Sequence, residues 1–374
     1  MRSNVKGWCP GALRPMEAGD GLIVRLRPRA SRLSAAQALA LADLAESHGS
    51  GEIELGNRAS LQLRGVRREA LSGLHRALDD LGLLDADAAT EARRNILTTP
   101  IAKDAETLGL SAALEAALAE ELDLPAKFGF AVDTGARAIL GGASADIRLE
   151  RAAKGLIVRA DGMALGEHVS ATAAIGRAMD LARWFHEHSD GHRRMASLVA
   201  AGSKPPLNAA LAPLQGEPLR PGNTEWGCCV ALPFGRLAAG TLRALAVASL
   251  RLTPWRSVLV EAAVPPSPDW IVDPADPALR VSACPGKPAC GSATVATREL
   301  ALQLAPHLTR SLSLHVSGCA KGCAHPRPAD ITLTGRAGRF ELIRDGCADD
   351  PPALTGLSID EIYALLRGPL APPL

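Results

Sequence analysis

Two stretches of the chain share one pattern of apolar and polar positions. One spans residues 21–42 (GLIVRLRPRASRLSAAQALALA) and the other spans residues 227–246 (GCCVALPFGRLAAGTLRALA). Each begins with a short apolar run, which predicts a strand, and continues with an Arg-Leu pair that we expect to open an Ala- and Leu-rich helix. Strand-like runs follow at residues 52–63 and 249–260. The pattern therefore predicts a strand-helix-strand unit that occurs twice.

A second pattern also occurs twice. Residues 145–162 (ADIRLERAAKGLIVRADG) resemble residues 329–346 (ADITLTGRAGRFELIRDG), and both alternate apolar with polar positions as β-hairpins do. Upstream of each hairpin we expect a helical run that ends in a strand, at residues 118–132 and 304–316. The order of the units indicates a duplicated chain whose halves enclose a cleft. Composition is the alternative explanation, because Ala-, Leu- and Arg-rich sequence readily matches itself.

Proline-rich stretches separate these units. Residues 204–221 are interpreted as the linker between the two halves, and a long amphipathic helix is expected before them at residues 169–188. Residues 265–277 separate the two units of the second half. We therefore expect several packed modules in the 374 residues of the chain, because single cores stop growing near about 250 to 300 residues.

The charge balance excludes some classes of partner. The chain has 41 Lys and Arg residues and 40 Asp and Glu residues, so it lacks the strongly basic character of nucleic-acid-binding proteins. No stretch reaches the roughly 18 consecutive apolar residues of a membrane span. Residues 1–10 (MRSNVKGWCP) have no apolar core like that of a signal peptide. We therefore expect a cytoplasmic protein that binds neither nucleic acid nor membranes, with any anion site confined to a local cluster.

Four of the eight cysteines form two pairs in the second half. Cys284 and Cys290 enclose five residues (CPGKPAC), and Cys319 and Cys323 enclose three (CAKGC). Four thiolates hold a cubane iron-sulfur cluster, and the prolines and glycines of the first pair suit a ligand loop whose N–H groups face the cluster sulfurs. Zinc is one alternative, although its structural sites favour gaps of about two to four residues. Disulfide bonds are another, although the reducing cytosol disfavours them.

The other cysteines and the histidines carry less information. Cys228, Cys229 and Cys347 are expected to be structural, and Cys9, in the sequence WCPG, is kept only as an additional candidate for the site. Two histidines flank the second cysteine pair and would be available to a second metal: His315 and His325.

Basic residues in the first half stand in motif-like surroundings. Arg58 lies in NRASLQL, Arg94 in RRNILTTP and Lys127 in LPAKFGF. Because side chains alternate along a strand, a strand carrying Arg58, Gln62 and Arg64 would place all three on one face. Guanidinium groups pair bidentately with carboxylates, so such a cluster suits a polycarboxylate ligand. Ordinary surface arginines are the alternative explanation.

These motifs resemble the nitrite/sulfite reductase superfamily, and most closely its precorrin-3B synthase branch. The strand-helix-strand units are similar to its ferredoxin-like half-domains, and residues 93–100 and 284–323 are similar to its tetrapyrrole and cluster domain. Residues 15–25 (PMEAGDGLIVR) and 317–326 (SGCAKGCAHP) resemble the synthase branch. The resemblance implies an α+β fold with duplicated architecture and pseudo-two-fold symmetry. Its two ferredoxin-like half-domains would span residues 15–80 and 220–265, and its two cluster- or tetrapyrrole-binding α/β halves would span residues 90–200 and 278–370.

The resemblance also implies roles for individual residues. One 4Fe-4S cluster would be held by four thiolates, of which the last matches the bridge to sirohaem iron in the reductases: Cys284, Cys290, Cys319 and Cys323. Substrate would be bound by a further set: Arg58, Gln62, Arg94, Lys127 and Lys321. The reductases have a second lysine two positions after Lys127, where this chain has Gly129. This departure disfavours oxyanion reduction and favours a bulkier substrate.

For the synthase branch, the resemblance implies precorrin-3A as an anionic tetrapyrrole substrate. O2 would supply a hydroxyl at C-20, a ring acetate would close a lactone, and NADH would supply electrons through a reductase. A further non-haem iron is implied, with ligands and the oxygen-activating group unidentified in the sequence. The alternative enzyme is a sirohaem-dependent nitrite or sulfite reductase. An iron-sulfur electron carrier or redox sensor is the alternative outside catalysis.

Overall fold

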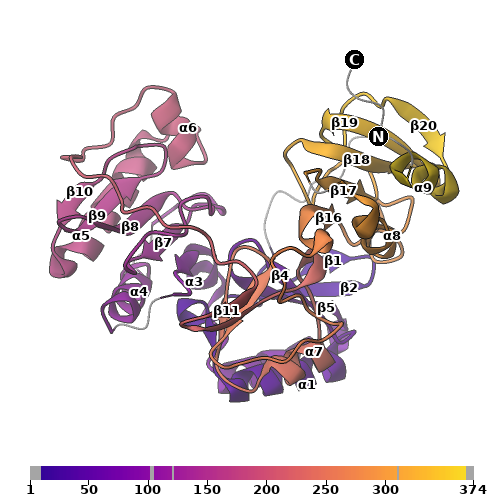
Figure 1. The fold of residues 1–374 in the computed structure, drawn as a ribbon. Coiled ribbons are helices and arrows are strands. Elements are labelled where there is room, and N and C mark those ends of the chain that lie inside the picture. Colours follow the sequence, from indigo (N-terminus) through magenta and orange to yellow (C-terminus); the bar gives the residue numbers. More distant parts are fainter. Residues whose placement is uncertain (1–9, 102–104, 120–121, 310, 368–374) are drawn as a thin grey trace. The chain divides into compact units, whose positions relative to one another are not determined.

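The computed structural model describes residues 10–101, 105–119, 122–309 and 311–367 (Figure 1). These residues form helices and four five-stranded sheets, which confirms the α+β class. The described residues divide into two compact units, one made mainly of residues 22–230 and 237–265 and the other mainly of residues 266–367. Among the described residues, none of the helices is both long and apolar enough to cross a membrane.

The first two sheets have matching strand orders. The first runs β1 (Met16–Ala18), β2 (Gly21–Leu26), β5 (Ser60–Val66), β4 (Glu52–Gly56) and β13 (Arg236–Ala238). The second runs β11 (Gly222–Thr224), β12 (Gly227–Ala231), β15 (Ser257–Val260), β14 (Leu250–Leu252) and β3 (Arg32–Leu33). Each sheet thus takes its last strand from the other repeat, and Leu33 of β3 stands opposite Leu250 of β14. This reciprocal exchange joins the two repeats.

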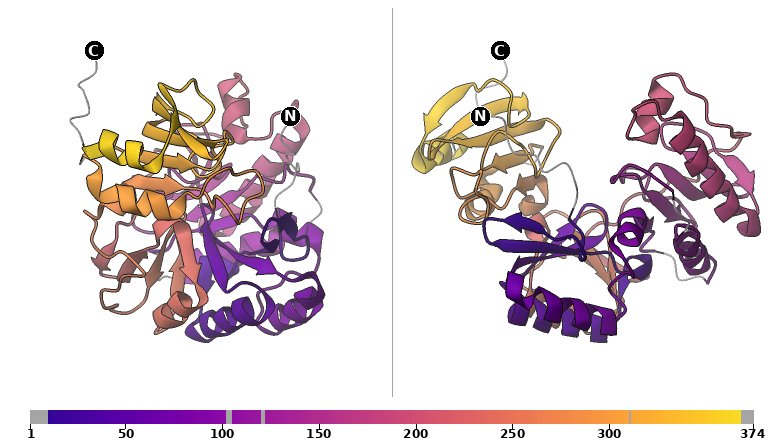
Figure 2. Two further views of the ribbon diagram at one scale, coloured as in Figure 1. Left: turned by 90° about the vertical axis from the view of Figure 1, so that its right-hand side faces the viewer. Right: turned by 180° about the vertical axis from the view of Figure 1, so that it is seen from behind.

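The Arg-Leu pairs were expected to open helices, and this expectation is wrong. They form the exchanged strands β3 and β13, and the helices α1 (Ala35–His48) and α7 (Ala239–Leu245) begin after them. Ser34 ends the short strand segment and caps α1, because its Oγ accepts a hydrogen bond from the Gln37 N–H at 3.1 Å. The two helices contact each other, and the left view of Figure 2 shows them side by side.

The runs at residues 52–63 and 249–260 were expected to be single strands, and each contains two. β4 and β5 are joined by a turn in which Ala59 has φ 48°, and β14 and β15 by a turn in which Arg256 has φ 57°. Backbone in this left-handed region reverses the chain direction, so each run folds into a hairpin. Both runs lack the Asn-Gly or Asp-Gly signal that marks the commonest hairpin turns.

The third and fourth sheets also match each other. The third runs β10 (Glu167–Val169), β9 (Gly155–Ala160), β8 (Ile147–Ala152), β7 (Phe130–Asp133) and β6 (Ile96–Thr98). The fourth runs β20 (Leu354–Leu357), β19 (Arg339–Gly346), β18 (Ala329–Arg336), β17 (Leu314–Ser317) and β16 (Val281–Ala283). In both, three parallel strands are followed by antiparallel ones, and the expected hairpins are confirmed as β8-β9 and β18-β19.

Helices pack on both of these sheets. The third sheet packs against α4 (Ala105–Ala117) and α5 (Ala171–His188) through apolar side chains that include Phe130 and Phe185. The fourth packs against α8 (Arg298–Leu304) and α9 (Ile359–Arg367) through side chains that include Leu333 and Ile362. The remaining helices are α2 (Leu71–Asp80), α3 (Ala88–Arg93) and α6 (Met195–Ala200).

The helical runs expected at residues 118–132 and 304–316 are displaced. α4 ends at Ala117 and α8 at Leu304, so each run begins where its helix stops. Pro125 interrupts the first run, because proline removes a backbone donor. Pro306 lies in a short 3-10 helix, Ala305–His307, that follows α8 directly. The strands β7 and β17 follow at the expected ends of the runs.

The expected linker region contains no helix and only isolated bridges between residues 203 and 220. It is held along the third sheet by backbone hydrogen bonds. The Ala138 N–H donates to the Leu214 carbonyl at 2.7 Å, and the Gly166 N–H donates to the Leu211 carbonyl at 2.8 Å. The linker is therefore an extended segment packed on the first half of the chain.

Candidate functional site

The four candidate ligand cysteines lie in two loops that follow neighbouring strands. β16 ends directly before Cys284, and β17 ends two residues before Cys319. The two strands are parallel, with Val281 opposite Leu314. Because parallel strands end at the same edge of a sheet, the topology brings both loops to one edge.

Hydrogen bonds join the two loops. The Gly318 N–H donates to Sγ of Cys284 at 3.2 Å, and the Thr294 N–H donates to the Gly318 carbonyl at 2.9 Å. Within the first loop the Cys290 N–H donates to the Gly286 carbonyl at 2.8 Å. The backbone of one ligand loop therefore already faces a sulfur of the other.

The cysteines also influence one another electrostatically. Burial is the largest cause that raises the pKa of Cys323, followed by the negative charges of Cys319, Cys284 and Cys290, while Lys321 opposes the shift. Cys284 is buried, Cys290 and Cys319 are half-buried, and Cys323 reaches the surface. Cys323 therefore lies within electrostatic range of the other three thiols and borders solvent.

The donor chemistry of this group fits a cubane. Thiolates without carboxylate ligands are the donors that iron-sulfur clusters take, and each thiolate binds a different corner of a cubane. In the described parts of the chain, no three His, Cys, Asp or Glu side chains gather closely enough to enclose a single metal ion. Gly286 in the first loop lies so close to Thr297 that a side chain would not fit. A Cβ on Gly286, which has φ 66°, would lie 2.5 Å from Thr297 Oγ1.

Other residues considered near the cysteines have ordinary surroundings. Lys321 is exposed, and its Nζ donates to Ser292 Oγ at 3.0 Å. The rings of His315 and His325 lie 5.7 Å apart. Cys347 Sγ lies 3.8 Å from the Pro326 carbonyl oxygen. Cys228 and Cys229 are buried in β12, whereas Cys9 lies outside the described residues.

Arg27, the residue directly after β2, lies within electrostatic range of other arginines. Burial, followed by the neighbouring charge of Arg25, lowers the pKa of Arg27 to about 10, and Arg94 and Arg58 add to this effect while Glu91 opposes it. A guanidinium loses part of its proton affinity where other cations surround it. The same field attracts anions.

Arg25 and Arg27 were not selected from the sequence. They occur as alternating basic positions in IVRLR, a pattern that places both side chains on the same face of a strand. Arg25 stands opposite Gln62 of β5, so β2 brings Arg25 beside a predicted binding residue. The alternation could have identified them.

The expectation that one strand carries Arg58, Gln62 and Arg64 is wrong for Arg58, whereas Arg64 follows Gln62 by two positions on β5. Arg58 lies in the turn before β5, where Ala59 reverses the backbone, and its Nη2 donates to Ser144 Oγ at 3.3 Å. Arg64 is buried and pairs with Glu54, with 3.4 Å between Nη1 and Oε2. Gln62 is half-buried on β5 itself.

Arg94 is held in a buried ion pair. It is 5% exposed, and its Nε and Nη2 donate to the two carboxylate oxygens of Asp85 at 2.8 and 2.9 Å. Nη2 also donates to the Arg27 carbonyl at 2.7 Å. In this arrangement Arg94 neutralises Asp85 and supports the strand of Arg27. Direct contact between Arg94 and a substrate stays a prediction.

Lys127 is exposed in a loop whose next two residues are held by side chains of other segments. The Asn95 side chain donates to the Phe128 carbonyl at 2.9 Å, and the Gly129 N–H donates to Asp146 Oδ2 at 2.9 Å. Arg194 links this loop to Ser144, the hydrogen-bond partner of Arg58. It donates to Asp146 Oδ1 at 2.9 Å and to Ser144 Oγ at 3.0 Å. Residues distant in sequence thus share one hydrogen-bonded network.

The packing around Gly129 explains why this position holds a glycine. A Cβ at this position would lie 2.6 Å from Asn95 Nδ2 and 3.0 Å from the Asn95 carbonyl oxygen. Cβ atoms in proteins essentially never lie this close to another heavy atom, and adding atoms to a packed core is destabilising. The chain therefore has no space for a lysine at this position as it is folded.

Comparisons with known proteins were made for the whole chain. Residues 14–81 match the nitrite/sulfite reductase ferredoxin-like half domain. A precorrin-3B synthase from Sinorhizobium sp is 28% identical over 400 residues, covering 93% of this chain and 84% of that protein. A ferredoxin–nitrite reductase from Leptolyngbya laminosa is 30% identical over 96 residues, covering 25% of this chain and 19% of that protein.

A solved structure shares the fold. The NirA protein of Mycobacterium tuberculosis superposes with a TM-score of 0.63 at 18% identity. The match covers 92% of this chain and 79% of that one. At this identity the similarity concerns the fold alone.

Proposed function

We propose that this chain is an oxygen-dependent tetrapyrrole monooxygenase of cobalamin biosynthesis. Its resemblance to the nitrite/sulfite reductase superfamily and to precorrin-3B synthase is confirmed. It would convert precorrin-3A to precorrin-3B by hydroxylation at C-20 and closure of a lactone. The observation that carries this proposal is the 28% identity to a precorrin-3B synthase over 93% of the chain. One oxygen atom enters the product, and a pair of electrons derived from NADH reduces the other to water.

The arginines of the first sheet suit the anionic rim of such a substrate. Arg25 and Arg27 would bind the acetate and propionate groups, together with Gln62, Arg58 and Lys127. Charge-assisted hydrogen bonds to carboxylates contribute about 1.5–3 kcal/mol each, so two or three of them orient the macrocycle firmly. Arg94 would hold this side of the site in place through Asp85.

The thiolates of the fourth sheet suit the redox group. Cys284, Cys290, Cys319 and Cys323 would hold one 4Fe-4S cluster, which supplies electrons one at a time. The Gly318 N–H that faces Cys284 Sγ would favour the reduced form by hydrogen bonding to a ligand sulfur. A reductase would deliver the electrons, and any further non-haem iron has no ligand set assigned among these residues.

The test uses the reconstituted full-length protein. Anaerobic protein is mixed with precorrin-3A and a reductant, then exposed to O2, and products are separated by mass. A product heavier by one oxygen that carries the hydroxylactone is expected. Reactions that leave precorrin-3A unchanged, with an intact cluster present throughout, would overturn the proposal.

A sirohaem-dependent nitrite or sulfite reductase is the second candidate. The match of 96 residues to a ferredoxin–nitrite reductase supports it. The contact between a Cβ at Gly129 and Asn95 counts against it, because the second lysine of the reductases does not fit there. The absorption spectrum of the purified protein separates the candidates: a haem-type Soret band favours the reductase, and cluster absorption alone favours the monooxygenase.

A further inference from the structure

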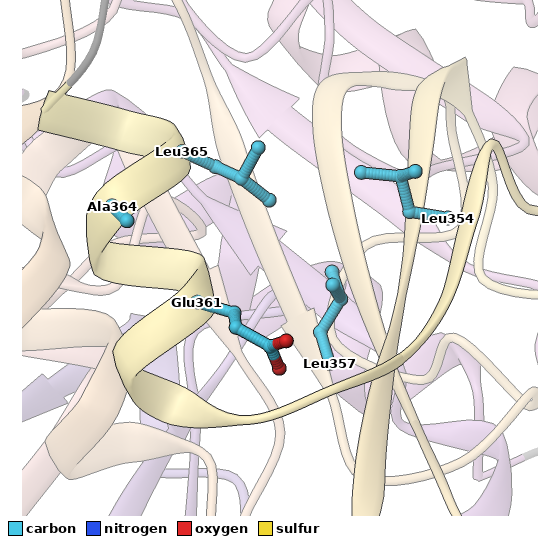
Figure 3. Close-up of a pocket in the computed structure, with 5 residues that line it drawn as sticks. All are labelled: Leu354, Leu357, Glu361, Ala364 and Leu365. Carbon is cyan, nitrogen blue, oxygen red and sulfur yellow. The ribbon is translucent and has the colours of Figure 1, made fainter.

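An apolar groove lies between the edge strand of the fourth sheet and its last helix. Leu354 and Leu357 of β20 line one side, and Glu361, Ala364 and Leu365 of α9 line the other (Figure 3). The two leucines at the mouth, Leu354 and Leu365, point into the same space (Figure 3). Leu354 is 41% exposed. None of the five lining residues is a candidate metal ligand or belongs to the arginine group.

The first half of the chain has a matching place. Leu354 stands opposite Leu342 of β19, as Glu167 of β10 stands opposite Val158 of β9. Each edge strand is followed by a serine whose Oγ accepts a hydrogen bond from the first turn of the next helix, at Ser170 before α5 and at Ser358 before α9.

Counting from these serines identifies the matching helix positions. Arg177 lies seven residues after Ser170, and Leu365 lies seven residues after Ser358. The pair Glu167 and Arg177 therefore corresponds to the pair Leu354 and Leu365.

In the first half an extended segment occupies this place. Residues 206–211 of the linker run along β10 and α5. Arg177 donates to the Pro206 carbonyl, the Asn208 N–H donates to Glu167 Oε2 at 2.9 Å, and Leu207 packs against the core of the third sheet. Leu211 pairs with Gly166 in an antiparallel bridge. An ion pair, Glu167 with Arg177 at 2.9 Å, thus holds the backbone of the segment.

The second half has the same position between its edge strand and its last helix, but the side chains there are different. Leucines replace both members of the ion pair, so the groove offers apolar side chains where the first half offers charges. β20 is also an edge strand with mostly exposed residues, and an edge strand presents unpaired backbone groups to which a further strand can add. An occupant would therefore be extended, would insert apolar side chains and would need few polar contacts.

We propose that the groove between β20 and α9 binds an extended, leucine- and proline-containing segment of a partner protein. The segment lies along β20 as residues 206–211 lie along β10, and one leucine enters between Leu354 and Leu365 as Leu207 enters the first half. Proline suits such a segment because it favours extended backbone and leaves no N–H without a partner. The proposal does not rest on the catalytic function.

The test measures binding of a labelled peptide to the full chain by fluorescence anisotropy. The probe is PPLNAALA, the chain's own sequence at residues 205–212, and the control probe PPSNAASA lacks both leucines. Saturable binding of the first probe and at least about tenfold weaker binding of the second are expected, a ratio that corresponds to about 1.4 kcal/mol. Equal binding of both probes would overturn the proposal.

Variants locate the binding. The double variant Leu354→Asp with Leu365→Asp places two like charges in the apolar groove and is expected to weaken probe binding at least about tenfold. Leu302→Glu alters another leucine of 41% exposure, on α8, and is expected to bind the probe as the unaltered chain does. Thermal unfolding of each variant confirms that it is folded.

Other occupants give distinct outcomes. A chain shortened after Arg367 is compared with the full chain. Binding that appears only in the shortened chain would assign the groove to residues 368–374 and overturn a partner segment. Concentration-dependent dimers that the double variant abolishes would assign it to a second copy, with the same consequence. No binding in either chain would also overturn the proposal.

Discussion

The backbone N–H of Gly318 donates a hydrogen bond to the sulfur of Cys284 across 3.2 Å. One residue belongs to the loop after β17 and the other to the loop after β16. A donor already aimed at a thiolate lowers the cost of placing negative charge there, and it tunes the potential of any cluster that the thiolate binds. Two kinds of substitution test this relationship.

Cys284→Ser is expected to abolish cluster assembly, because a cubane needs all four thiolates. Iron and acid-labile sulfide content and the EPR spectrum of anaerobically purified protein are the measurements. Cys347→Ser, which alters a half-buried cysteine outside the two pairs, is the control and is expected to retain the full cluster. A Cys284→Ser protein with unchanged iron and sulfide would contradict the ligand assignment.

Gly318→Ala is expected to lower the free energy of unfolding by about 1–3 kcal/mol, the typical cost of overpacking. Its Cβ would lie 2.6 Å from the Ala293 Cβ, so the ligand loop must shift and the bond to Cys284 must lengthen. Denaturant unfolding measures the first effect and redox titration the second. Gly291→Ala is the matched control, because a Cβ there meets nothing within 4 Å. Equal stability of the two variants would refute the packing argument.

Arg27→Gln is expected to weaken binding of an anionic tetrapyrrole by about 10-fold to 100-fold, which is the loss of one charge-assisted hydrogen bond of about 1.5–3 kcal/mol. Quenching of intrinsic fluorescence on titration with a porphyrin carboxylate is the measurement. Arg243→Gln is the control, because Arg243 pairs with Asp43 and Glu46 on the surface of α1 and α7. Equal binding of the porphyrin carboxylate by both variants would contradict the proposed anion site.

Gly129→Ala is expected to destabilise the fold by about 1–3 kcal/mol, because the new methyl group would meet the Asn95 side chain and carbonyl. Gly129→Lys is expected to be no less harmful and to gain no sulfite or nitrite reduction. Gly142→Ala, where a Cβ meets nothing within 4 Å, is the control and is expected to be neutral. Melting temperatures decide, and a Gly129→Lys protein as stable as the unaltered chain would contradict the prediction.

Asp133 of β7 is expected to make stability depend on pH. It is 1% exposed, and burial is the main cause that raises its pKa from 3.8 to about 7, although the Leu140 N–H donates to its Oδ2 at 2.6 Å. The folded chain therefore retains a proton that the unfolded chain releases. The free energy of unfolding should fall as the pH rises from about 4 to about 7, by up to about 1.4 kcal/mol per pKa unit.

Asp133→Asn removes the titrating group and should flatten this dependence. Urea unfolding of both chains at several values across that pH range is the measurement. Asp349→Asn, at an exposed position, is the control and should keep the slope of the unaltered chain. Identical slopes for Asp133→Asn and the unaltered chain would show that another group is responsible.

The sequence by itself determined the features that depend on near neighbours along the chain. Alternating apolar positions identified the hairpins β8-β9 and β18-β19, and their likeness to each other identified the duplication. The spacing of Cys284 to Cys290 and of Cys319 to Cys323 identified the candidate ligand loops. These signals are local, because periodicity and ligand spacing each involve only a few consecutive residues.

Only the tertiary structure decided which distant residues meet. The two-residue strand β3 is too short for any periodicity, so its place beside β14 of the other repeat depends on long-range pairing. Arg94 was predicted to bind substrate, yet whether a guanidinium is free or neutralised depends on a carboxylate elsewhere in space, here Asp85. The neighbours of Arg25 and Arg27 are likewise set by the fold. Pairing and neutralisation are properties of the folded chain, and a linear pattern does not contain them.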